Sequence, residues 1–204
     1  MEHYYTNNPT SKSEEKEIEY YIADKKIKLV VDNGVFSKNH VDIATNFMLN
    51  VLLKENIKGD VLDVGCGYGV IGITLASFFK DLKVVMIDIN ERALGLAKKG
   101  VKLNKLDNIS VLESDGLSAL KESEKFDCVV TNPPIRAGKQ VLYKMYEDSF
   151  NHLKEGGVLL LVINKKHGAP STKDYLMDLF GNCEVLDKKT GFNVIKCVKN
   201  NPDA

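Results

Sequence analysis

The stretch Asp60-Val-Leu-Asp-Val-Gly-Cys-Gly-Tyr-Gly69 decides the fold, because a short apolar strand runs directly into a glycine-rich loop. Glycines in such a loop turn the chain sharply and let a ligand approach the backbone closely. A helical pattern begins at about residue 70. This order of strand, loop and helix is typical of α/β proteins that bind a ligand beyond the carboxyl ends of parallel strands.

Outward from this stretch, strand-like and helix-like segments alternate along the chain. Helices are expected from about residue 70 and at residues 91–104, 139–153 and 174–180. Strands are expected at residues 60–64, 83–87, 109–112, 126–131, 157–163, 184–186 and 193–198. The pattern predicts an α/β fold with a Rossmann-like, mostly parallel sheet of seven strands and helices on both faces.

The first part of the chain has a different character. Residues 1–16 are polar and mixed in charge, which predicts a flexible arm. Residues 17–58 are expected to form a β-hairpin, with strands at 18–22 and 27–31, followed by an entry helix at about 40–55. Residues 59–200 then form the ligand-binding domain, and the whole chain of 204 residues is expected to be a single domain.

Composition excludes several classes of protein. Basic and acidic residues are equal at 28 each, so no global field draws the molecule onto nucleic acid, and any such contact needs a local patch. The longest apolar run, residues 158–163, is too short to cross a membrane, and the start of the chain does not resemble a secretory signal. The four cysteines and four histidines lack metal-ligand spacing. We expect a cytoplasmic, metal-free protein, a monomer with a homodimer as the alternative.

Two cofactor classes use such a glycine loop. Gly67-Tyr-Gly69-Val-Ile-Gly72 satisfies the dinucleotide fingerprint G-x-G-x-x-G, so the motif alone leaves a nicotinamide enzyme open. Asp63 shifts the balance, because a carboxylate there would face a diphosphate unfavourably but favour the ammonium and sulfonium charges of S-adenosylmethionine. Charge therefore favours the methyl donor.

Acidic residues follow the next two strands. Asp88 can accept hydrogen bonds from both ribose hydroxyls, a role that NAD sites share. Asp115 can accept one from the adenine amino group, while Gly116 lets the ring pack closely. The S-adenosylmethionine contacts expected from the sequence are Asp63, Gly65, Cys66, Gly67, Asp88, Ile89, Asp115, Gly116 and Asn132.

The most specific motif is Asn132-Pro-Pro-Ile135, directly after the strand at 126–131. Proline fixes φ and forces the preceding residue into an extended conformation, so the backbone of this motif is rigid. The Asn132 amide oxygen and the Pro133 carbonyl can accept the two N–H groups of a planar amine and aim its lone pair at a donor methyl group. Asn-Pro also ends strands at turns, which is the plainer interpretation of the motif alone. With the glycine loop and the aspartates, it predicts amine methylation with Asn132, Pro133 and Pro134 as the catalytic group.

Together these motifs resemble class I methyltransferases of amino nitrogens over residues 60–198. Asn33-Gly-Val-Phe-Ser37 and Asn132-Pro-Pro-Ile-Arg-Ala-Gly-Lys139 resemble more narrowly the small-domain methyltransferases similar to ribosomal RNA small-subunit methyltransferase C, a guanine-N2 enzyme. The resemblance implies ribosomal RNA or the small ribosomal subunit as the partner. It also implies substrate contacts at Phe36, Ile135, Arg136 and Lys139. Longer members carry a second amino-terminal domain, and many amino-methyltransferases have an aromatic residue at the position of Ile135.

Other targets stay open at this stage. A protein-glutamine methyltransferase shares Asn-Pro-Pro, because a side-chain amide is also a planar NH₂ donor, and an adenine-N6 methyltransferase of nucleic acid shares it too. An inactive binding scaffold and a nicotinamide oxidoreductase are the remaining classes. Several basic residues could form a local phosphate-binding patch or be ordinary solvated charges: Arg136, Lys139, Lys144, Lys165, Lys166, Lys188 and Lys189.

Overall fold

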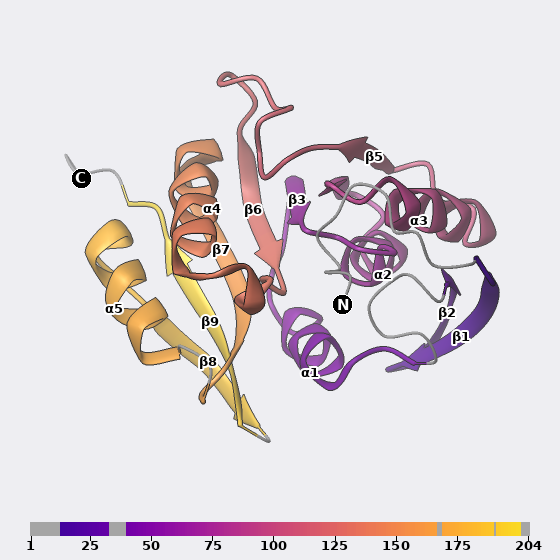
Figure 1. Ribbon diagram of the computed structural model, residues 1–204, viewed down its shortest axis with the longest axis horizontal. Helices are drawn as coiled ribbons and strands as arrows, with labels where there is room; N and C mark the ends of the chain where they lie inside the picture. The colour runs from indigo at the N-terminus through magenta and orange to yellow at the C-terminus, as the bar shows by residue number, and fades with distance from the viewer. Residues whose placement is uncertain (1–12, 33–39, 167–168, 190, 201–204) are drawn as a thin grey trace.

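The computed structural model describes residues 13–32, 40–166, 169–189 and 191–200, and these form a seven-stranded sheet with helices on both faces (Figure 1). The sheet order is β5-β4-β3-β6-β7-β9-β8. The first five of these strands run parallel, and β9 is antiparallel to both of its neighbours. The strands are β3 (Asp60–Val64), β4 (Lys83–Asp88), β5 (Ile109–Glu113), β6 (Phe126–Thr131), β7 (Leu153–Asn164), β8 (Glu184–Lys189) and β9 (Phe192–Val198). The predicted Rossmann-like fold is confirmed.

Alternating side chains of the strands feed two apolar cores, one on each face of the sheet. Val61 and Val130 point to the core that contains α1 (Ile43–Leu52), α2 (Val70–Phe78) and α3 (Glu91–Leu103). Leu62 and Val129 point to the opposite core, with α4 (Lys139–His152) and α5 (Ala169–Phe180). Figure 1 shows the two groups of helices on either side of the sheet. Strands buried on both faces explain the continuous apolar runs of the sequence.

The predicted amino-terminal hairpin is present as β1 (Lys16–Ile22) and β2 (Lys25–Val31), and it packs against α3. Its turn is shorter than predicted, with two residues instead of four. Ala23 takes a left-handed φ of 47°, a conformation for which sequence rules expect glycine or asparagine. Because alanine rarely takes this conformation, the sequence did not predict the two-residue turn.

The last residues of the predicted arm are tied to the domain. The Ser13 hydroxyl and the Glu14 backbone N–H both donate to the Asp32 carboxylate, at 2.9 and 2.7 Å. Asp32 also forms an ion pair of 2.6 Å with Arg92 of α3. Residues 1–12 of the arm lie outside the described residues.

One helix begins earlier than predicted. We expected α5 at residues 174–180, whereas it runs from Ala169 to Phe180. Pro170 lies in the first turn of α5. Backbone N–H groups have no acceptor within the helix at that position, so the missing N–H of proline does not disrupt the helix. The early start brings the amino end of α5 to the edge of the sheet where β7 ends.

Candidate functional site

The carboxyl ends of β3, β4 and β6 are fastened to one another. Gly65 and Cys66 donate their backbone N–H groups to the Ile87 carbonyl at 2.9 and 3.0 Å, which joins the loop after β3 to β4. The Thr131 hydroxyl donates to the Val64 carbonyl at 2.8 Å, which joins the end of β6 to the end of β3. The glycine loop, the Asp88 turn and Asn132 therefore share one edge of the sheet.

The glycines of this edge have space above them. Gly65, Gly67 and Gly116 have φ values of 69°, 55° and 56°, in the left-handed region that favours glycine. A Cβ added at any of the three would meet no other atom within 4 Å. These positions were predicted as cofactor contacts, and their open surroundings leave room for a ligand close to the backbone.

Asp63 lies beneath the loop and is fully buried. Its Oδ2 accepts the Gly72 N–H at 2.9 Å, whereas Oδ1 has no hydrogen-bond partner among the described residues. Burial, assisted by the nearby charge of Asp88 and opposed by the Gly72 N–H, raises the pKa of Asp63 to about 7. An ammonium group would supply the missing donor and favour the ionised form. The neighbouring Cys66 is buried as well, and burial raises the pKa of its thiol well above the usual value, so it packs as a neutral side chain.

Asp88 ends β4 and holds the glycine loop. Its Oδ2 accepts the Gly67 N–H at 2.8 Å and its Oδ1 accepts the Asn90 N–H at 2.9 Å. Burial raises the pKa of this carboxyl group, and the backbone N–H groups oppose that rise. The remaining lone-pair capacity of the carboxylate could accept a ribose hydroxyl.

The remaining predicted cofactor residues lie around Asp88. Ile89, the next residue, is half-buried, and its apolar side chain can pack against an adenine ring. The Ser114 N–H donates to the Asp88 carbonyl at 3.0 Å, which brings the turn after β5 to the same place. Asp115 and Gly116 follow in that turn and are exposed. This part of the site is open to solvent.

The Asn132 side chain is held by a residue that the sequence did not reveal. Its Nδ2 donates to Thr45 Oγ1 at 2.9 Å. Thr45 is 5% exposed and lies in the first turn of α1, where Asp42 caps the helix by accepting the Ala44 and Thr45 N–H groups. Because this bond orients the amide, it also fixes the direction of Oδ1, the acceptor atom of the side chain. The only sequence signal was a polar side chain on the apolar face of a helix.

The two prolines lie at the start of a hydrogen-bonded turn. Pro133 is buried, and its carbonyl accepts the Ile135 N–H at 2.9 Å, which leaves one lone pair for a further donor. The Pro134 carbonyl accepts the Ala137 N–H at 2.8 Å and starts a 3-10 turn at Ile135–Ala137. The motif therefore leads directly into a short helical turn at the edge of the sheet where the parallel strands end, called the carboxyl edge below.

The predicted substrate residues are not all brought together. Ile135 is half-buried and packs against the core beneath α4, while Arg136 and Lys139 are exposed on either side of Gly138. Phe36 lies outside the described residues. Among the described residues, the Asn132 side chain donates its hydrogen bond to Thr45 and not to Ile135, Arg136 or Lys139.

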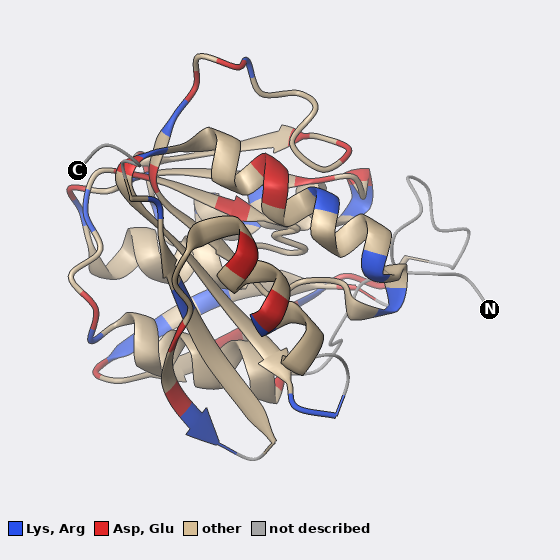
Figure 2. Cartoon of the chain, turned by 90° about the vertical axis from the view of Figure 1, so that its left-hand side faces the viewer, with Lys and Arg blue, Asp and Glu red and all other residues tan. Residues whose placement is uncertain are grey.

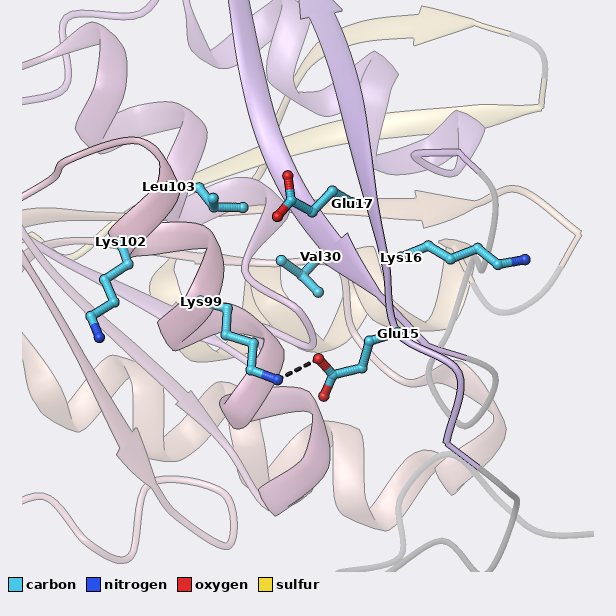
Figure 3. A pocket seen from close by; sticks show the side chains of 7 residues that line it. All are labelled: Glu15, Lys16, Glu17, Val30, Lys99, Lys102 and Leu103. Atoms are coloured by element: carbon cyan, nitrogen blue, oxygen red, sulfur yellow. Dashed lines mark hydrogen bonds and ion pairs between the residues drawn. The ribbon is translucent and has the colours of Figure 1, made fainter.

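A hollow of about 490 Å³ lies elsewhere, between the hairpin and α3 (Figure 3). Glu15 and Lys99 form an ion pair across it, and Lys16, Glu17 and Lys102 add charges of both signs. None of its residues is a predicted site residue, and its mixed charge offers no distinct ligand chemistry. The geometry at the carboxyl edge, not this hollow, defines the functional site.

The residues present fit S-adenosylmethionine better than a dinucleotide. A buried carboxyl group with an unpaired oxygen and a second carboxyl group nearby suit a cationic ligand, which would favour their ionised forms, and oppose a diphosphate. The open glycines provide the cradle. The fold and the site define an S-adenosylmethionine-dependent methyltransferase of class I.

Comparison with known proteins narrows this class. Residues 26–196 match the family described as "Methyltransferase small domain". "Uncharacterized protein YbxB" of Bacillus subtilis is 41% identical over 198 residues, covering 97% of this chain and 98% of that protein. "Ribosomal RNA small subunit methyltransferase C" of Mannheimia succiniciproducens is 37% identical over 169 residues, covering 81% of this chain and 49% of that protein. The chain belongs to the methyltransferase small-domain family.

A solved structure agrees with this assignment. The T. thermophilus 16S rRNA N2 G1207 methyltransferase, in complex with AdoMet and guanosine, superimposes with a TM-score of 0.83 and 28% sequence identity. The match covers 95% of this chain and 52% of that chain. The chain thus spans about half the length of the ribosomal RNA methyltransferases it matches. Among its described helices, none has the length and apolar character needed to cross a membrane.

Proposed function

We propose that the protein methylates the exocyclic N2 amine of a guanine in small-subunit ribosomal RNA. The observation that carries the proposal is the Asn132 amide, fixed by Thr45 at 2.9 Å and located beside the glycine loop. A fixed amide oxygen at that place suits an acceptor with two N–H groups. The guanosine in the T. thermophilus relative, which is named as a 16S rRNA N2 G1207 enzyme, supports guanine as that acceptor.

The chain's own residues perform positioning and charge stabilisation. S-adenosylmethionine supplies an electrophilic methyl group, with Asp63, Asp88 and the glycine loop holding it. Asn132 Oδ1 and the free lone pair of the Pro133 carbonyl would accept the two N–H groups of the amine and fix its plane. The same oxygens would stabilise the positive charge that develops on nitrogen, after which the surplus proton passes to water.

The amine must leave its base pair to reach this site. The guanine N2 group takes part in pairing, so the acceptor nucleotide is expected to be unpaired or flipped out of its stack. Half-buried Asn132 is accessible to such a base, whereas a paired base would be blocked by its own partner. This expectation applies to ribosomal RNA free or within the small subunit.

The test is transfer of labelled methyl groups from S-adenosylmethionine to undermodified small ribosomal subunits, followed by nucleoside analysis. Labelled N2-methylguanosine is the expected product. Label in N6-methyladenosine or in a protein glutamine would replace the proposed target with one of these alternatives. The matched control is Asn132→Ala, which should lose nearly all turnover while its affinity for S-adenosylmethionine stays within a few-fold; full activity in this variant would refute the role of Asn132.

A further inference from the structure

A second group of polar side chains gathers at the carboxyl edge, beyond the methyl-transfer site. Lys165 follows β7, Lys173 lies in α5 and Lys188 lies near the end of β8. These three lysines line a hollow of about 430 Å³, whose other lining residues are Ala169, Pro170, Asp174 and Asn193. Lys166 and Lys189 are exposed beside it in the chain.

The sheet topology explains why these residues meet. β9 is antiparallel to β7 and β8, and Phe192 pairs with Asn164 on one side and with Lys189 on the other. The end of β7, the end of β8 and the start of β9 therefore lie together. β7 also pairs with β6, where Thr131 is opposite Leu161. The hollow consequently lies on the same edge as Asn132 and begins two strands from the glycine loop.

The charge of this region is predominantly positive. The five lysines at 165, 166, 173, 188 and 189 outnumber the neighbouring Asp174 and Asp187. In the part of the chain that the structure describes, no ion pair joins any of these lysines to a carboxylate. Blue segments at the strand ends beside α5 show the arrangement in Figure 2. Unpaired lysines on a molecule of zero net charge form a local attraction for an anion.

Asn193 adds a second observation. It is 6% exposed and lines the hollow, and its Oδ1 is buried with no hydrogen-bond partner among the described residues. An unpaired buried acceptor is costly, and a hydroxyl donor would satisfy it. The 2′-hydroxyl of ribose is a donor that accompanies phosphate in RNA and is absent from DNA.

We propose that this lysine hollow binds the ribose-phosphate backbone of the RNA strand that carries the target nucleotide. The inference rests on the proposed function, because it makes RNA the substrate. Lysines at 165, 173 and 188 contact the phosphates, and Asn193 receives a 2′-hydroxyl. The strand then passes from the hollow to Asn132 along one edge of the sheet, so the bound backbone presents the base to the site.

The first test measures the binding of a single-stranded RNA by fluorescence anisotropy over a range of salt concentrations. One variant carries three Lys→Gln changes in the hollow, at Lys165, Lys173 and Lys188. The control carries three Lys→Gln changes near the amino ends of β3 and β4, at Lys58, Lys80 and Lys83. These lysines are also exposed, and their replacement changes the net charge equally. Each phosphate contact contributes about 0.7 to the slope of log K against log salt, so the hollow variant should lose about 2 from its slope.

The control should keep the wild-type slope. Equal slopes for the wild type and the hollow variant, or equal losses in both variants, would overturn the proposed surface. A competing DNA strand of the same sequence tests Asn193: wild type should prefer RNA, and Asn193→Ala should reduce that preference. An unchanged preference in Asn193→Ala would overturn the hydroxyl contact.

The outcome is separable from that of the proposed function. Methylation of RNA by the wild type with no effect of the hollow variant would refute only the surface. Lysine-dependent RNA binding with label found in another RNA nucleoside would refute the proposed guanine target and leave the surface standing. A wild type that binds no RNA would overturn both. Unchanged S-adenosylmethionine affinity and far-ultraviolet circular dichroism confirm that the variants are folded.

Discussion

The Thr45–Asn132 contact gives the sharpest prediction. Thr45→Val keeps the shape of the side chain but removes the hydroxyl that accepts from Asn132 Nδ2 at 2.9 Å. The bond is of ordinary length and its acceptor Thr45 is 5% exposed, so its loss should cost about 1–2 kcal/mol, between the net value of a typical hydrogen bond and the cost of an unpaired buried group. If the amide must be oriented for catalysis, this cost appears in the transition state and kcat falls about 5- to 30-fold.

The assay separates kcat from KM with the RNA substrate and measures S-adenosylmethionine affinity in parallel. We expect the KM for RNA and the cofactor affinity to change little, because Thr45 positions Asn132 and contacts neither ligand in the described structure. Thr45→Ser keeps the hydroxyl and should restore most of the turnover. In an Asn132→Ala background, Thr45→Val should have no further effect on turnover. The positioning role would be refuted if Thr45→Ser and Thr45→Val lost equal turnover. It would also be refuted if Thr45→Val lowered turnover by the full factor in the Asn132→Ala background.

Two further predictions concern the buried residues beneath the glycine loop. Burial raises the pKa of Asp63 from 3.8 to about 7, so the folded protein holds this proton more tightly than the unfolded chain, and the free energy of unfolding should fall as pH rises from about 4 to 7. Denaturant unfolding at pH 5 and pH 8 should show Asp63→Asn gaining stability relative to wild type at the higher pH; a pH-independent difference would contradict this. A Cβ at Gly72 would lie 2.5 Å from Met86 Sδ and 3.2 Å from Asp63 Oδ2, so Gly72→Ala should lower the free energy of unfolding by about 1–3 kcal/mol. Gly95→Ala is its control, since a Cβ at this exposed helical position meets nothing within 4 Å and should stabilise the helix; equal destabilisation of both would exclude the steric cause.

The sequence predicted the sheet well because the signal is local. Strands covered on both faces need apolar side chains at successive positions, and β3, β6 and β7 have them. The errors fall where one residue departs from its usual conformation. Ala23 makes a tight turn without glycine or asparagine, and α5 begins at Ala169, ahead of the predicted residue 174, with Pro170 in its first turn.

The site was predictable to the extent that its residues follow strands. Asp63, Asp88 and Asn132 lie at or directly after strand ends, so the parallel sheet alone brings them to one edge. Thr45 is 87 residues from Asn132 in the chain, and only the packing of α1 against the sheet brings the two together. No periodicity or motif in the sequence predicts a contact between residues so far apart. The identity of the methylated nucleotide depends on surfaces outside these motifs and stays a prediction.

The order of the strands explains how a chain of zero net charge could serve two ligands of opposite charge. Carboxylates gather at the ends of β3 and β4, lysines gather at the ends of β7 and β8, and β6 with Asn132 lies between them. A cationic cofactor and an anionic strand would therefore approach Asn132 from opposite sides. Asp63 is buried, Asp88 is half-buried and both are poorly screened, whereas the lysines are mostly exposed. Added salt should therefore weaken RNA binding strongly and S-adenosylmethionine binding little, and parallel losses would show that one charged surface serves both ligands.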